Sequence, residues 1–105
     1  MATFDKREKG FESKFAHDQE MAFKVQARRN KLLGLWAAEI LGLAADAAET
    51  YAKQVVMSDL EEPGEDDVFA KVYNDLKEKG VSEHQVRREM ASLLEVAREQ
   101  IETDG

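Results

Sequence analysis

The positions of proline and glycine leave this chain few ways to fold. Pro63 is the only proline, and no proline interrupts residues 5–41. Proline breaks helices because it lacks a backbone N–H donor and clashes with the preceding turn. Gly42, Pro63-Gly64 and Gly80 stand where helix ends or turns fit, which predicts four helical segments. Because apolar and polar residues nowhere alternate for the length of a strand, we expect an all-α fold, a four-helix bundle.

The fourth segment carries the clearest helix signals. Ser82 and Gln85 stand three residues apart, as in a capping box, where each side chain bonds the other residue's backbone N–H. This pair predicts a helix that begins near Ser82. The helix would be amphipathic, because its apolar residues recur at helical spacing: Val86, Met90, Leu93, Leu94, Ala97 and Ile101.

The two middle segments are shorter. The second is expected from about Asp46, a plausible N-cap, to Leu60, since Pro63 prevents its continuation. The third begins at Glu65-Asp66-Asp67, whose carboxylates favour the positive end of a helix dipole, and should end before Gly80. Its apolar side would carry Val68, Phe69, Val72 and Leu76.

The first segment is too long for a small bundle to cover. A helix over its 37 residues, 5–41, would extend about 55 Å. We therefore divide it near His17, into a mobile N-terminal arm (residues 1–19) and a part that forms the first helix of the bundle. The four-helix bundle as a whole is residues 20–105. The arm is expected to be frayed or disordered in the free protein. The bundle part has an aliphatic stripe, with Trp36 interpreted as a core residue: Met21, Val25, Leu32, Leu33, Trp36 and Ile40.

Charge is distributed unevenly along the chain. Residues 1–31 hold eight Lys and Arg against five Asp and Glu, a balance of +3, and residues 32–105 hold seven against seventeen, −10, which together give the net charge of −7. An acidic body argues against nucleic-acid binding, which needs a broad basic face. The chain has no cysteine, no secretory signal pattern, and no apolar run of the roughly 20 residues that span a bilayer. These features predict a cytoplasmic protein without direct membrane insertion.

Two patterns resemble metal sites, and neither is complete. His17 and Glu20 have the spacing of half a di-iron site, but the only other histidine, His84, lies in a predicted capping turn. A calcium loop beginning at Asp59 would need a glutamate at its twelfth position, which is Ala70. We therefore expect no catalytic residue, no metal and no enzyme activity. The rival interpretation is a small hydrolase or a metal-dependent helical bundle.

A basic cluster, Arg28-Arg29-Asn30-Lys31, lies within the first bundle helix. A solvated helix face is the default interpretation, and an acidic subunit surface or a nucleotide phosphate are the alternatives. The six glycines are isolated, so the chain has no glycine-rich phosphate loop. No cofactor is expected, and any nucleotide binding would be weak and made by side chains.

Several sequence runs resemble the zeta-subunit family of alphaproteobacterial ATP synthases, at similar spacing over nearly the whole chain. The most specific are Lys-Phe-Ala-His-Asp at residues 14–18 and Arg-Arg-Asn-Lys-Leu-Leu-Gly-Leu-Trp-Ala at residues 28–37. Further runs are Tyr51-Ala52-Lys53, Glu61-Glu62-Pro63-Gly64-Glu65-Asp66-Asp67-Val68-Phe69 and Gly80-Val81-Ser82. The resemblance implies a four-helix bundle whose N-terminal segment enters the synthase between the catalytic subunits and the central rotor. That segment would block rotation in the direction of ATP hydrolysis.

The arm itself supports a binding role. Phe4, Phe11 and Phe15 are spaced by seven and four residues, so they fall on one side if the arm is helical. Charged neighbours could pair at the rim of such a contact, and the expected partner-binding residues are Phe4, Asp5, Lys6, Arg7, Glu8, Phe11, Lys14 and Phe15. We expect a monomer when free, associated with the membrane only through the synthase. The alternative is a small helical adaptor or regulatory protein of another complex.

Overall fold

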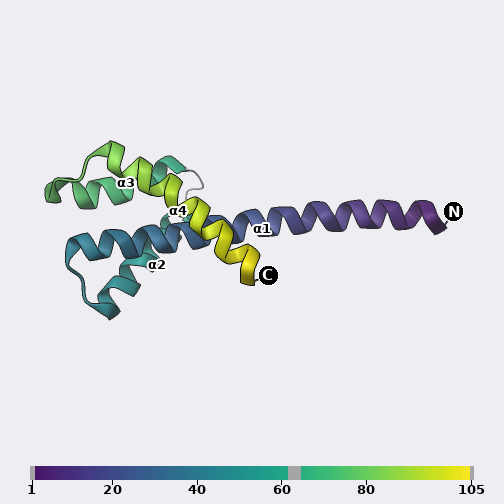
Figure 1. The fold of residues 1–105 in the computed structure, drawn as a ribbon, viewed down its shortest axis with the longest axis horizontal. Helices are drawn as coiled ribbons and strands as arrows, with labels where there is room; N and C mark the ends of the chain where they lie inside the picture. The colour runs from purple at the N-terminus through teal and green to yellow at the C-terminus, as the bar shows by residue number, and fades with distance from the viewer. Residues whose placement is uncertain (1, 62–64, 105) are drawn as a thin grey trace.

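Four α-helices make up almost all of the described chain (Figure 1). The computed structural model describes the backbone of residues 2–61 and 65–104, and the side chains of residues 19–59 and 66–103. Within those ranges there is no β-strand, which confirms the all-α prediction with a long first helix. The helices are α1 (Ala2–Leu41), α2 (Ala45–Glu61), α3 (Glu65–Leu76) and α4 (Glu83–Asp104), with a 3₁₀ turn η1 (Lys77–Lys79) between the last two.

The long helix α1 serves as the axis on which the others pack. The helices α2, α3 and α4 all contact it, and α4 crosses it so that the C-terminus lies beside α1 (Figure 1). The N-terminal part of α1 extends well past the other three helices (Figure 1). The molecule therefore measures 64 × 25 × 23 Å.

The backbone of α1 is one helix from Ala2 to Leu41, so it passes through the predicted division near His17 without a break. No proline lies in this stretch, so nothing in the backbone chemistry forces an interruption. The backbone of the N-terminal segment is helical from Ala2. The division of the chain at residues 19 and 20, and the mobility of the arm, stay predictions.

Local backbone chemistry ends α1 and begins α4 where the sequence predicted. Gly42 adopts a φ of 76°, and the amides of Gly42 and Leu43 donate to the carbonyl oxygens of Glu39 (3.1 Å) and Ala38 (3.0 Å). These two bonds form a Schellman motif, which glycine favours because it has no Cβ to clash in the left-handed region. At α4, the Ser82 amide donates to Gln85 Oε1 (2.8 Å) and the Gln85 amide to Ser82 Oγ (3.1 Å), confirming the capping box.

The core lies where α2, α3 and α4 meet α1. Its residues come from the apolar stripes that the sequence predicted for α3 and α4, together with residues of the C-terminal half of α1 and the middle of α2. The buried cluster consists of Leu33, Ala37, Ala38, Tyr51, Val55, Val68, Val72, Leu76, Val86 and Met90. Trp36 packs against this cluster but is only partly buried, at the edge between α1 and α4, so its predicted place inside the core is corrected.

Helices α1 and α2 approach most closely at Gly34. A Cβ at this position would lie 2.6 Å from the Ala52 Cα, a backbone atom that cannot rotate away. It would also lie 3.3 Å from Val55 Cγ2. Because Gly34 has no side chain, α1 and α2 can lie this close together. This close spacing brings Val55 into the core.

We expect Gly34→Val to lower the free energy of unfolding by about 2–3 kcal/mol, because the added carbons force α1 and α2 apart. Ala47→Val, at an exposed position of α2, is the matched control and should cost only about 0.5 kcal/mol through helix propensity. Urea unfolding followed by circular dichroism measures both. Equal stability of the two variants would show that the close contact at Gly34 is not needed.

Candidate functional site

The residues predicted to bind the partner all lie in the N-terminal part of α1. Their backbone is helical, and their side chains lie outside the described residues: Phe4, Asp5, Lys6, Arg7, Glu8, Phe11, Lys14 and Phe15. What the structure describes is the bundle to which this segment is joined. Two features of that bundle bear on function: how it holds α1, and which surfaces it leaves open.

The bundle holds α1 through contacts with α4 that begin near residue 21. Val25 is the first buried residue among the described side chains. Arg28 Nη1 donates to Gln100 Oε1 at 2.9 Å, joining α1 to the C-terminal part of α4. Met21 and Val25 line a shallow opening together with Leu94 of α4. The N-terminal part of α1 thus continues from a point that is packed against α4.

The default interpretation of the basic cluster at residues 28–31, a solvated helix face, is contradicted by the structure. Arg29 is 2% exposed and Asn30 is 0% exposed. The Arg29 Nε donates to Asn30 Oδ1 at 2.8 Å, and Asn30 Nδ2 donates to Asp59 Oδ2 of α2 at 3.2 Å. A buried guanidinium is retained only where hydrogen bonds and a carboxylate offset its lost hydration. This polar group joins the middle of α1 to the C-terminal part of α2.

A signal for this burial was present in the sequence. Val25, Arg29, Leu33 and Ala37 form one row at four-residue steps, and the other three members of the row are apolar. All four are buried in the structure. The sequence interpretation instead grouped Arg29 with its charged neighbours along the chain, which point to other sides of the helix.

A second polar contact joins α2 to α3. The Tyr51 hydroxyl donates to Asp75 Oδ2 at 2.8 Å, and Lys71 Nζ lies 3.3 Å from the same oxygen. Burial, followed by the hydrogen bond to Asp75 and the charge of Asp75, raises the pKa of the Tyr51 hydroxyl above its ordinary range. Because this pKa is raised on folding, the neutral hydroxyl stabilises the fold fully at neutral pH. That contribution is lost as the pH rises above about 10.

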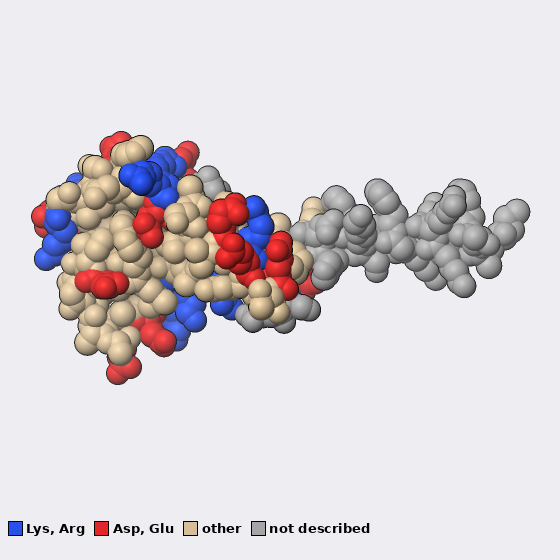
Figure 2. Space-filling model, viewed as in Figure 1, with Lys and Arg blue, Asp and Glu red and all other residues tan. Residues whose placement is uncertain are grey.

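Acidic side chains gather on another part of the surface. Figure 2 shows Asp and Glu concentrated towards the C-terminal half of α4, near the place where α1 leaves the bundle. Glu95, Glu99 and Glu102 are exposed there. Carboxylates at the negative end of a helix dipole do not stabilise the helix. They give the surface beside the base of the arm a negative potential.

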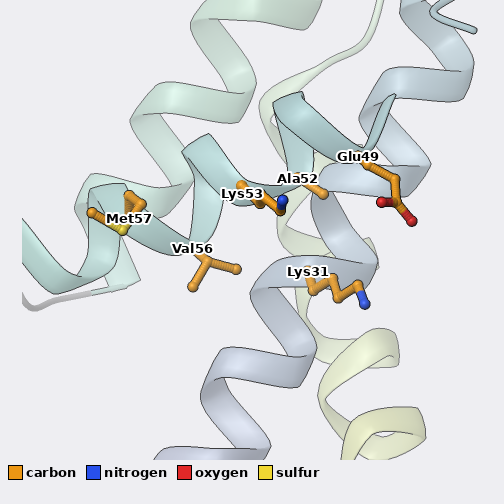
Figure 3. Close-up of a pocket in the computed structure, with 6 residues that line it drawn as sticks. All are labelled: Lys31, Glu49, Ala52, Lys53, Val56 and Met57. Carbon is orange, nitrogen blue, oxygen red and sulfur yellow. The ribbon is translucent and has the colours of Figure 1, made fainter. Parts of the chain in front are cut away.

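An apolar opening lies between α1 and α2, on the side of Lys31. It has a volume of about 310 Å³ and is lined by Lys31, Glu49, Ala52, Lys53, Val56 and Met57. Figure 3 shows Lys31 reaching from α1 along the opening, whereas the other five residues come from α2. Contact of a nucleotide phosphate with the basic cluster at residues 28–31 stays a prediction, as does weak nucleotide binding in general.

Neither a metal cluster nor a membrane span was found in the described part of the chain. No three His, Asp or Glu side chains there lie close enough to hold a metal ion together, and His84 is exposed in the first turn of α4. No helix there combines the length and apolar character needed to cross a bilayer.

Comparisons with known proteins show which family has this sequence and fold. A family model described as ATPase inhibitor subunit zeta matches residues 1–100. A solution NMR structure is 47% identical in sequence, with a TM-score of 0.73, and the match covers 81% of this chain and 99% of that one. No curated protein matches the chain. Because the family match spans all four helices, the chain belongs to the ATPase inhibitor subunit zeta family.

Proposed function

We propose that this chain is an inhibitory subunit that binds the soluble catalytic sector of ATP synthase and blocks rotation in the direction of ATP hydrolysis. In this proposal the N-terminal segment, residues 1–19, is the inhibitory element. Its partners are the catalytic subunits and the central rotor subunit, on the cytoplasmic side of the membrane. The observation that carries the proposal is the family match, which covers the N-terminal segment as well as the bundle.

The shape of α1 supports a division of roles between arm and bundle. The arm and the first bundle helix share one continuous backbone from Ala2 to Leu41. At 1.5 Å per residue, residues 2–19 extend about 27 Å as a helix, which is long enough to enter a cleft between subunits. Because α1 is packed against α4 from about Val25 onward, the docked bundle would fix the direction in which the arm points.

The composition of the arm suits helix-in-groove recognition. Phe4, Phe11 and Phe15 share one side of a helix by their spacing, and burial of each would contribute about 1.5–3 kcal/mol. Such anchors must offset the cost of ordering the segment, about 1–2 kcal/mol per residue for any part that is unfolded when free. A backbone that is already helical lowers this cost. The proposal assigns no chemical step to the chain, which would act by obstructing a moving part.

The direct test is ATP hydrolysis by the cognate catalytic sector from which this subunit has been removed. We expect the full chain to inhibit hydrolysis in a saturable, dose-dependent way when it is added back. The matched control is the same chain after heat unfolding, which should not inhibit. If the folded chain binds the sector but leaves hydrolysis unchanged at saturation, inhibition by this chain is refuted and only its place as a subunit stands.

A further inference from the structure

A second surface, on the bundle itself, has the features of a docking groove. The opening between α1 and α2 adjoins another of about 460 Å³, and the two share Lys31 and Val56. The second opening follows the exposed side of α1 past Phe23 and Ala27, with Ile101 of α4 at its edge. Together they form one continuous depression, which we call the α1–α2 groove.

The floor of the α1–α2 groove exposes large apolar side chains to water. Phe23 is 58% exposed and Met57 is 51% exposed, and they are the two most exposed large hydrophobic residues that the structure describes. One lies in each of the two openings, with Val56 between them. Scattered single apolar residues are ordinary on a surface, but a connected row along a groove marks an interaction site.

The rim of the α1–α2 groove is basic, although the whole chain carries a net charge of −7. Its charged lining residues are one acid, Glu49, and four cations: Lys24, Arg28, Lys31 and Lys53. Lys31 and Lys53 make no hydrogen bond or ion pair with any described side chain, and Lys24 has only a long contact of 3.8 Å with Glu20. At least two cationic side chains, Lys31 and Lys53, are therefore available to pair with a carboxylate of another protein.

Neither the arm nor α4 of this chain fits the groove. The arm, residues 1–19, holds four Lys and Arg against four Asp and Glu, so it carries no excess of negative charge to match a basic rim. The acidic helix α4 already buries Val86, Met90 and Ala97 in the bundle, so a second copy could not present that apolar stripe without unfolding. Charge and apolar character together call for a helix from another protein, with an apolar stripe flanked by Asp and Glu.

We propose that the α1–α2 groove binds an acidic amphipathic helix of the ATP synthase catalytic sector, as a second anchor beside the N-terminal arm. The inference rests on the proposed function for the identity of the partner. The apolar stripe of that helix covers Phe23, Val56 and Met57, and its carboxylates meet Lys31 and Lys53. Two linked contacts on one chain raise the apparent affinity above that of either alone, because the second contact forms at high effective concentration.

The first test separates binding strength from maximal inhibition. The double variant Phe23→Glu/Met57→Glu places two carboxylates on the floor of the groove, at positions exposed enough to leave folding intact. We expect it to need at least about tenfold more protein for half-maximal binding to the catalytic sector, with unchanged inhibition at saturation. The control Leu43→Glu/Val96→Glu changes two residues that are 37% exposed and line neither opening, and should bind within about twofold of the parent. Equal binding by the two double variants would overturn the proposal.

The second test identifies what lies on the groove and does not depend on inhibition. A photo-activated cross-linker replaces Met57 in the full chain, the complex with the catalytic sector is irradiated, and the joined peptide is sequenced. A cross-link to a synthase helix that carries Asp and Glu beside an apolar stripe supports the proposal. A cross-link to a second copy of this chain, to a basic or non-helical segment, or none at all, overturns it. If the full chain binds and cross-links as expected but does not inhibit hydrolysis, the proposed function fails and the groove assignment stands.

Discussion

A chain that lacks residues 1–19 is expected to lose all inhibition of ATP hydrolysis while its bundle melts close to the temperature of the full chain. The described core explains the second half of this expectation, because its most N-terminal member is Leu33 and the first buried residue is Val25. Removing the arm takes away no residue of that core, so the free energy of unfolding should change by less than about 1 kcal/mol. Hydrolysis assays and thermal unfolding on the same preparation measure both halves.

A full-length variant tests the three phenylalanines of the arm without shortening the chain. Phe4→Ala, Phe11→Ala and Phe15→Ala together should remove about 4–9 kcal/mol of the free energy that side-chain burial contributes to binding. The triple variant should therefore not inhibit hydrolysis at concentrations that saturate the parent. Neutralising charges at Lys6, Arg7 or Lys14 should weaken inhibition much less, because ion pairs at an exposed rim contribute about 0–1 kcal/mol each. A truncated chain that still inhibits would place the inhibitory element in the bundle.

Asn30→Ala is expected to lower the free energy of unfolding of the bundle by about 3 kcal/mol. Asn30 is fully buried, accepts a hydrogen bond from Arg29 and donates one to Asp59. Its truncation leaves a buried guanidinium without that acceptor and opens space beside it. For a domain whose total stability is on the order of 5–10 kcal/mol, this is a large fraction.

Asn74→Ala provides the matched control, since Asn74 is exposed on α3 and should change stability by less than about 0.5 kcal/mol. Urea unfolding monitored at 222 nm, a standard wavelength for helices, reports both variants. If Asn30→Ala unfolds within about 1 kcal/mol of the parent, the Arg29, Asn30 and Asp59 contacts are not important for stability.

Most helix boundaries could be predicted because they depend on short-range chemistry. Gly42 ends α1 through two backbone hydrogen bonds within five residues, and Ser82 begins α4 through a side-chain exchange with Gln85. Such contacts do not require any other helix to be in place. The division near His17 rests instead on the length of the bundle, and no local residue imposes a break in α1 there.

The candidate site was predictable only in part. The aromatic spacing of the arm is a property of the sequence, and so is its resemblance to the zeta family, which the family match confirms over residues 1–100. The α1–α2 groove was not predicted, since Phe23 and Met57 lie in different helices and come to line neighbouring openings only when α2 packs on α1. Nothing in a single helix indicates which apolar residue its neighbours will leave uncovered.

The sequence alone determined that this protein is all-helical, where α1 ends and α4 begins, and the family to which it belongs, because these follow from residues close together in the chain or from their order. The tertiary structure decided which sides of α1 are buried. Arg29 and Asn30 turned out to be interior because α2 approaches α1 at Gly34 and brings Asp59 to them, whereas Phe23 and Lys31 stayed exposed. Burial depends on what packs against a residue, and that is a property of pairs of helices and not of either one.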